Sequence, residues 1–424
     1  MSEILTLLEL IVRGLPAALA QPRYFPFFWI VVGLVALQYR RVAEGEQRLY
    51  GVVKNNAVRQ VLIALGFGLI GGVVASVIMA VVGVSLSGAG VTWLLPLALL
   101  LMAISPRLMC FSYAGGIISV SYLLFGWPKV HVPAIMALVA VLHLTESLLI
   151  YLRGAGCTTP VTVRNADAGA TRTGFLMQGF WPLPLLLLFV VSLPPDAPRD
   201  GLMEMPTWWP LIVPPAEVAA QENAVFTLFP VAAVLGYSDL AARFSPRRKA
   251  NRSAVMLLGY SVILLALAVL SAHQPATVWL VALWGPLGHE LVVRLGSRGE
   301  FAGRAALTAD PAGLTVLDVL PGGGAQAAGL RTGDVILDLD GRPAGDQAAL
   351  AEVLSGPPRS VAASVRRDGR VMERTIELKP LGPDGGLAIG VIPVPSAGEN
   401  PQMEIRNRGY LATLWDRLRR RLKR

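Results

Sequence analysis

Ionisable and sulfur-containing residues are scarce in this chain of 424 residues. Charged residues make up 15% of the sequence and hydrophobic residues 54%, and the mean hydropathy is +0.56. So little charge excludes a typical soluble globular protein and indicates a polytopic membrane protein. The two cysteines, Cys110 and Cys157, lie in or beside apolar segments and do not form a metal-type pair. They therefore give no sign of a disulfide framework or a zinc site.

The signatures of membrane proteases are also missing. An intramembrane zinc protease needs His-Glu-x-x-His, which places two imidazoles one helical turn apart with the glutamate as base. The His-Glu pair of this sequence is His289-Glu290, and Val293 stands where the second histidine should be. The sequence also has no G-x-S-x-G motif for a serine nucleophile. We therefore predict no catalytic centre, no metal site and no cofactor.

Two acidic residues near apolar segments leave other interpretations open. His143 and Glu146 are close enough on a helix to share a metal or exchange a proton. Two ligands are too few for a metal site, so we favour a structural hydrogen-bonded pair. Glu146 and Asp239 could instead belong to the ion path of a transporter. Internal repeats, which would support transport, are not evident.

Long apolar runs predict an α-helical polytopic membrane domain over residues 1–294, with about eight to ten crossings. Residues 4–20 are apolar but interrupted by Arg13 and Pro16, so they could form an amphipathic, re-entrant or weakly spanning helix. The other expected helical spans are residues 25–39, 60–84, 92–104, 110–127, 132–152, 175–193, 224–240, 253–272 and 277–293.

Basic residues gather on one side of the membrane if these spans alternate. The residues concerned are Arg40, Arg41, Arg107, Arg153, Arg164, Arg172, Arg243, Arg247, Arg248, Lys249, Arg252, Arg294 and Arg298. Cytoplasmic loops collect lysine and arginine, so we expect this side to be the cytoplasm. The segment after the last span is then cytoplasmic as well.

Residues 299–395 predict a compact α+β domain. Val335, Leu337 and Leu339 alternate as in a half-buried strand, and Asp340-Gly341 suits a hairpin turn. Ten positions have a fixed spacing: Pro321, Ala325, Ala328, Gly329, Leu330, Gly333, Asp334, Val335, Ile336 and Gly341. This pattern resembles the hallmark of bacterial PDZ domains, P-x-x-x-A-x-x-A-G-L-x-x-G-D-V-I-x-x-x-x-G. The resemblance implies a domain for protein interaction.

A PDZ domain binds an extended peptide by adding it as a strand to an exposed sheet edge. In the bacterial strand order, the receiving edge is expected before Gly313, in residues 299–308. The expected groove residues are Phe301, Ala302, Gly303, Leu350 and Leu354. The alternative is Ile389-Gly390-Val391, which has the apolar-Gly-apolar pattern of a carboxylate-binding turn but follows the last expected strand.

Residues 396–424 form a basic tail. Its apolar and basic positions separate on a helix, as in a helix that lies on an anionic membrane. The residues expected at the membrane surface are Trp415, Arg417, Arg419, Arg420, Arg421 and Lys423. A soluble basic tail or nucleic-acid contact is the alternative. Because the tail is tethered to a membrane protein, we expect it to bind membrane lipids and not nucleic acid.

Several stretches of the membrane half point to a family. They are TGFLMQGFWPLPLLLLF (173–189), GYSDLAARFSPRRK (236–249) and PLGHELVVRLGSRGE (286–300), followed directly by the PDZ pattern. Together they resemble the MinJ-type topological determinants of cell division in Gram-positive bacteria. The resemblance implies a non-enzymatic adaptor at septum and poles, which bridges a DivIVA-like scaffold to a MinD-like ATPase and so positions the division inhibitor. A PDZ-containing membrane protease is the main alternative, and a transporter is the second.

Overall fold

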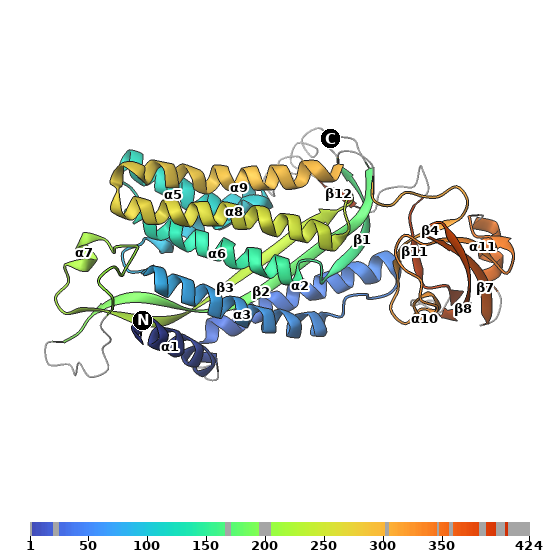
Figure 1. Cartoon of the computed structure of the whole chain (residues 1–424), viewed down its shortest axis with the longest axis horizontal. Helices are drawn as coiled ribbons and strands as arrows, with labels where there is room; N and C mark the ends of the chain where they lie inside the picture. The colour runs from blue at the N-terminus through green and yellow to red at the C-terminus, as the bar shows by residue number, and fades with distance from the viewer. Residues whose placement is uncertain are drawn as a thin grey trace, which may run out of the picture.

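The computed structural model describes residues 2–19, 25–165, 171–194, 205–301, 305–345, 347–355, 359–380, 387–395 and 403–405. Within these ranges, a helical bundle lies beside a long β-hairpin, and a small β-rich domain sits at one end of both (Figure 1). The helices are α1 (Ser2–Leu19), α2 (Pro26–Tyr50), α3 (Ala57–Val82), α4 (Leu94–Ile104), α5 (Phe111–Phe125), α6 (Val132–Arg153), α7 (Ala216–Ala219), α8 (Pro246–His273) and α9 (Val278–Phe301).

Four helical segments of the described chain are long and apolar enough to cross a membrane. They are Ala57–Val82, Val132–Arg153, Pro246–His273 and Pro275–Phe301, the last being α9 with the short turn η3 (Pro275–Thr277) in front of it. By helix length and composition the protein is therefore a multi-pass membrane protein. The prediction of eight to ten crossings is wrong, because several of the expected spans form shorter helices or strands.

Two of the expected helical spans are strands. Residues 175–192 of the first and 224–240 of the second lie in β2 (Thr171–Ser192) and β3 (Ala224–Ala241), which pair antiparallel from 175–192 to 224–241. They belong to a sheet with the order β12-β1-β2-β3, where β1 is Thr158–Asn165 and β12 is Met403–Ile405. Pro182 and Pro184 explain the difference, since two prolines two positions apart are incompatible with a helix interior.

Glycines of α3 let this helix lie directly on β2. A Cβ atom added to Gly68 would lie 2.1 Å from the carbonyl oxygen of Pro182, and one added to Gly72 would lie 2.1 Å from that of Pro184. No larger residue fits at either position. The two prolines have no N–H group, so the strand backbone meets the helix there without an unpaired donor.

Three further donors on the edge of β2 that faces the helices are paired with side chains. In a membrane protein, backbone groups away from water must find partners within the protein. The hydrogen bonds are Phe180 N to Tyr39 Oη (3.1 Å), Leu186 N to Ser76 Oγ (2.9 Å) and Val190 N to Ser87 Oγ (2.8 Å). This pattern explains how a strand can lie inside a helical membrane domain.

Helices α4 and α5 form a short hairpin rather than two crossings. With 11 residues, α4 rises only about 16 Å, and α5 has 15 residues. The turn η2 (Pro106–Met109) and Cys110 connect them, and α5 packs against α6 and α9. Apolar helices of this length are typical of re-entrant segments. The predictions that residues 92–104 and 110–127 each cross the membrane are therefore not supported.

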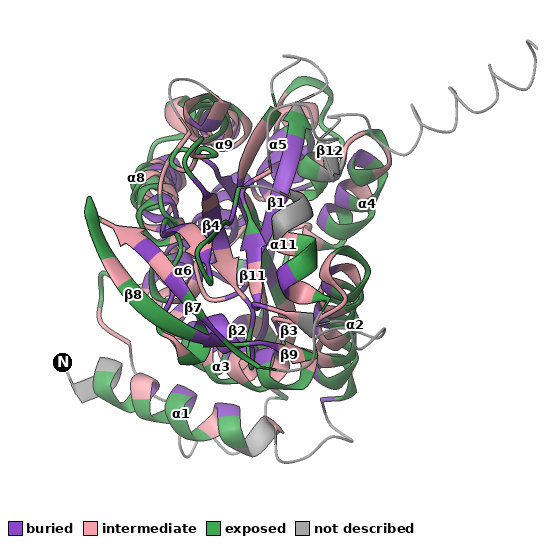
Figure 2. Ribbon diagram, turned by 90° about the vertical axis from the view of Figure 1, so that its right-hand side faces the viewer, coloured by how far each residue is buried: buried purple, intermediate pink, exposed green. Residues whose placement is uncertain are grey.

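The C-terminal domain has the sheet order β11-β4-β5-β7-β8. Its elements are β4 (Leu314–Val319), α10 (Gly324–Ala327), β5 (Val335–Leu339), β6 (Arg342–Pro343), α11 (Gln347–Leu354), β7 (Ser360–Arg367), β8 (Arg370–Glu377), β9 (Lys379–Pro380), β10 (Leu387–Ala388) and β11 (Val391–Pro393). Val316, Ile336, Val361, Val365 and Ile376 form the centre of its apolar core. Figure 2 looks onto this domain and shows β8 largely exposed.

The C-terminal domain packs on the membrane domain. Leu317 and Leu320 of the β4 segment, together with Ile392 and Val394 of the β11 segment, belong to the same apolar core as the helices. Side chains alternate between the two faces of a strand, so Val316 and Val391 point instead into the domain's own core. The sheet is thus buried on both faces near β4 and β11.

Most of the predicted tail lies outside the described residues, including Trp415, Arg417, Arg419, Arg420, Arg421 and Lys423. Residues 403–405 are described. They form β12, which pairs in parallel with β1 through Val163 and Met403. This part of the chain therefore returns to the membrane domain.

Candidate functional site

Strand β11 lies at one end of the C-terminal sheet. It pairs antiparallel with β4, with Val391 opposite Val319 and Ile392 opposite Asp318. The sheet order ends at β11, so in the described chain no strand pairs with its second edge. A free strand edge presents backbone donors and acceptors that can pair with another chain. This edge is the candidate peptide-binding site.

A glycine turn leads into β11. Gly390 has a φ of +82°, a conformation that residues with a Cβ atom rarely adopt. A Cβ atom at this position would also lie 2.8 Å from the Cα atom of Gly323. The turn is anchored on both sides, because Ile389 O accepts from Ala325 N and Gly390 O accepts from Leu320 N, each at 2.8 Å. Only glycine satisfies this geometry.

Helix α11 contributes apolar side chains to the same domain core. Leu350 and Leu354 are half-buried and pack against this core, as does Val391 of β11. The structure therefore brings the two predicted leucines into one cluster with the alternative segment 389–391. The apolar-Gly-apolar pattern of this segment is visible in the sequence, but the return of β11 to the side of β4 is not.

The described residues of the segment 299–308 do not form the strand beside β4. Phe301 is the last residue of α9 and packs near Val161, Val163 and Leu240 of the other sheet. Ala302 and Gly303 lie outside the described residues. The position next to β4, where the receiving edge was expected, is occupied by β11. Of the described residues of the predicted edge strand, 299–301 end α9 and 305–308 form no strand.

A family model described as a PDZ domain matches residues 285–378. The match covers the second half of α9 and the elements from β4 to β8, and it ends before β9, β10 and β11. The C-terminal domain is a PDZ domain. Two solved PDZ domains are also similar, those of the SdrC-like proteins of Listeria monocytogenes and Listeria innocua. The first is 19% identical to this chain, with a TM-score of 0.19. The match covers 21% of this chain and 94% of the L. monocytogenes domain. The second is 21% identical, with the same TM-score of 0.19. The match covers 20% of this chain and 99% of the L. innocua domain.

One curated relative is the magnetosome formation protease MamE of Magnetospirillum gryphiswaldense. It is 35% identical over 139 residues, which are 29% of this chain and 18% of the relative. This chain therefore spans less than a fifth of that protein's length. The likeness is confined to a segment and does not carry the relative's activity to this chain.

The PDZ pattern has a structural explanation at Asp334. This carboxylate is 1% exposed and accepts two hydrogen bonds of 2.7 Å from the guanidinium of Arg367. The same guanidinium donates to the carbonyl of Gly329 at 2.8 Å. Nearby, the backbone N–H of Ala312 and the guanidinium of Arg366 hold the pKa of Asp310 below its usual range. These ion pairs connect β7 to the ends of β4 and β5.

The histidines and acids singled out in the membrane domain have unexpected partners. Within the described residues, His143 makes no hydrogen bond with Glu146, so the expected hydrogen-bonded pair does not form. Its Nδ1 atom instead contacts the carbonyl of Val139 at 2.8 Å, and its Nε2 atom lies 3.0 Å from the Sγ atom of Cys110. His289 lies on the other side of the same sulfur, at 3.7 Å. These three side chains could together hold a metal ion.

Glu290 and Asp239 are engaged in ion pairs. Glu290 contacts Arg107 at 3.1 Å and Arg294 at 2.6 Å. Asp239 contacts Lys249 at 3.0 Å, and Lys249 is buried with a further acidic neighbour, Glu300, at 3.7 Å. The contacts of Lys249 tie β3, α8 and α9 together, and the Glu290–Arg107 pair ties α9 to η2, which gives both acids a structural role.

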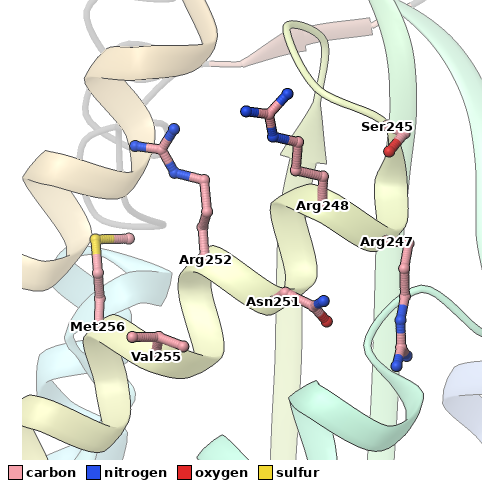
Figure 3. A pocket seen from close by; sticks show the side chains of 7 residues that line it. All are labelled: Ser245, Arg247, Arg248, Asn251, Arg252, Val255 and Met256. Atoms are coloured by element: carbon pink, nitrogen blue, oxygen red, sulfur yellow. The ribbon is translucent and has the colours of Figure 1, made fainter.

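Basic side chains surround the start of α8. Arg247, Arg248 and Arg252 line a surface pocket there, together with Asn251 (Figure 3). The guanidinium carbons of Arg248 and Arg252 lie 5.0 and 4.7 Å from the ring centre of Phe244. Because Lys249 of α8 contacts Glu300 near the end of α9, this basic surface lies at the same end of the bundle as the PDZ domain.

Proposed function

We propose that the protein is a non-enzymatic membrane adaptor that receives a peptide segment of a partner protein on β11 of its PDZ domain. One observation carries the proposal: β11 is an edge strand that follows the Gly390 turn. Backbone hydrogen bonds to such an edge provide affinity, and neighbouring apolar side chains provide specificity. Leu350 and Leu354 of α11 would supply that apolar surface.

The PDZ domain is proposed to face the cytoplasm. Arg247, Arg248 and Arg252 lie at the end of the bundle that carries this domain. Loops rich in arginine remain on the cytoplasmic side during membrane insertion. The peptide site would then meet cytoplasmic partners close to the membrane.

The proposed setting is bacterial cell division. The sequence resemblance to MinJ-type determinants supports a role between a DivIVA-like scaffold and a MinD-like ATPase, at the septum and poles. The basic tail, residues 396–424, would add contact with anionic lipid. In this proposal the membrane spans anchor and orient the PDZ domain, and no reaction is assigned to them.

Localisation of a fluorescent fusion tests this function. In a Gram-positive host with its own Min proteins, we expect the full chain to concentrate at septa and poles. Deletion of residues 299–395 should leave the protein in the membrane but spread its fluorescence evenly. Uniform membrane fluorescence of the full chain would contradict the division role.

A further inference from the structure

Cys110, His143 and His289 meet inside the helical bundle although they come from three different elements. Cys110 lies at the tip of the α4–α5 hairpin, His143 is in the middle of α6, and His289 is in the middle of α9. Their ligand atoms all lie within 4.8 Å of one another. We propose that these three side chains bind a zinc(II) ion through the cysteine sulfur and one ring nitrogen of each histidine. The proposal is independent of the peptide-binding function.

The spacing of the ligand atoms fits a metal. Zinc–sulfur and zinc–nitrogen bonds of about 2.3 and 2.05 Å, at a tetrahedral angle, place the sulfur and nitrogen about 3.6 Å apart. The Sγ atom of Cys110 lies 3.0 Å from Nε2 of His143 and 3.7 Å from Nε2 of His289. The second distance already matches, the first would have to widen by about 0.6 Å, and the ligand atoms of the two histidines lie within 4.8 Å of each other.

The ring of His143 is held as a metal ligand usually is. A ligating histidine generally has its second ring nitrogen bonded to a carbonyl or carboxylate. In His143, Nδ1 lies 2.8 Å from the carbonyl of Val139, which directs Nε2 toward Cys110. In His289, Nδ1 is buried and finds no hydrogen-bond partner among the described residues. This ring is thus not held by the hydrogen bonds that normally explain a buried histidine.

The ligand atoms, one sulfur and two nitrogens, favour zinc over magnesium or calcium. Thiolate and imidazole ligands suit zinc and copper(I), whereas magnesium and calcium require oxygen ligands. The nearest acid in sequence, Glu290, is occupied by Arg107 and Arg294 and also accepts from Tyr113 Oη at 2.7 Å. Three protein ligands with nitrogen and sulfur donors match the zinc sites that keep a fourth position for water. The thiol of Cys110 would release its proton to solvent on binding.

Aromatic side chains flank the cluster. The ring of Tyr260 lies 5.5 Å from the ring of His143 and 5.7 Å from that of His289, and Tyr113 lies 5.2 Å from His289. The hydroxyl of Tyr260 donates to the carbonyl of Gly285 at 2.9 Å, which fixes this ring against α9. Such an apolar shell limits access of water to the metal. Zinc would join the α4–α5 hairpin to α6 and α9.

Metal content of the full-length protein tests the proposal. The protein is purified in detergent, washed with chelator, incubated with zinc chloride and desalted, and its zinc is measured by mass spectrometry. We expect about one zinc per chain, as for a single three-ligand site. Cys110→Ser, His143→Gln and His289→Gln should each lower the zinc content to background. Cys157→Ser and His273→Gln are matched controls outside the cluster and should retain the wild-type content.

Protection of the thiol provides a readout that does not depend on the folding of cluster variants. In the Cys157→Ser protein, Cys110 is the remaining cysteine. Zinc should slow its alkylation by N-ethylmaleimide about tenfold or more, because the bound thiolate is no longer free to react, and magnesium should not. Zinc content that survives Cys110→Ser, alkylation unchanged by zinc, or retention of copper(I) without zinc would each overturn the assignment.

Discussion

Lys54 and Asp318 form an ion pair that connects the loop between α2 and α3 to strand β4 of the PDZ domain. The Lys54 ammonium also donates to Thr158 Oγ1 at 3.1 Å, so it joins three parts of the chain. Both members of the pair are largely buried, with side-chain exposures of 21% and 13%. Together with the apolar contact of Leu317 and Ile392, this pair docks the PDZ domain on the membrane domain.

Replacing Lys54 by alanine should loosen this docking. The carboxylate of Asp318 would remain partly buried without its counter-charge, at a cost of about 1–3 kcal/mol. We expect backbone amides of β4 and β11 to exchange with deuterium about tenfold faster. The double variant Lys54→Asp with Asp318→Lys should restore slow exchange. Unchanged exchange in the single variant would show that the apolar contact alone holds the domain.

The PDZ domain could be predicted from sequence because its glycine and apolar positions have a fixed spacing, from Pro321 to Gly341. Spans at 60–84, 132–152, 253–272 and 277–293 also correspond to α3, α6, α8 and α9, whose apolar runs are long. The pairing of β2 with β3 could not be predicted, since an apolar run has the same appearance in a buried strand and a buried helix. Pro182 and Pro184 argue against a helix at this point, but they do not indicate which segment pairs with β2.

The groove and the cysteine–histidine cluster depend on contacts between distant segments. The pattern at residues 389–391 was visible, but its place beside β4 follows from the path of the chain after β8. Likewise, Cys110 meets His143 and His289 only because the α4–α5 hairpin turns back inside the bundle. The spacing of residues along the sequence predicts neither arrangement.

Ser76→Ala tests how β2 is stabilised. Ser76 Oγ accepts from Leu186 N at 2.9 Å, and no water is expected to replace it between α3 and β2. Loss of this acceptor should lower the free energy of unfolding by about 1–3 kcal/mol, measured on detergent-solubilised protein. The control is Thr145→Val, because Thr145 Oγ1 donates only to the helical carbonyl of Val141. Equal stability of both variants would contradict the proposed role of Ser76.

Gly369 and Gly390 both have a positive φ, and replacing each by alanine distinguishes backbone strain from a steric clash. Gly369 has a φ of +77° and open space around its Cα atom, so Gly369→Ala should cost about 1–2 kcal/mol. Gly390→Ala adds a clash with the backbone of Gly323. It should therefore lower the stability of the domain by about 1–3 kcal/mol more than Gly369→Ala, as overpacking does. Local hydrogen exchange in the PDZ domain measures both. Equal effects would mean that β11 moves away freely from Gly323.

Asp310 gives the PDZ domain a pH-dependent contribution. Its pKa is lowered by the backbone N–H of Ala312 and by Arg366, so the ionised form is favoured in the folded state. The stabilisation is present above the ordinary aspartate pKa of about 3.9 and is lost as the pH falls through the lower folded pKa. The wild-type protein should therefore have a higher melting temperature than Asp310→Asn at neutral pH, and this difference should vanish in acid. A difference that persists in acid would contradict this account.

Crosslinking from β11 tests the central claim most directly. A photoreactive amino acid is placed at Val391, which is half-buried in the edge strand, or at Val371, which is 59% exposed on β8 at the opposite edge of the sheet. In dividing cells of a host with its own Min proteins, we expect position 391 to crosslink to a DivIVA-like or MinD-like partner and position 371 to give little of that product. Equal crosslinking from both positions, or none from 391 while the fusion still concentrates at septa, would contradict peptide binding at β11.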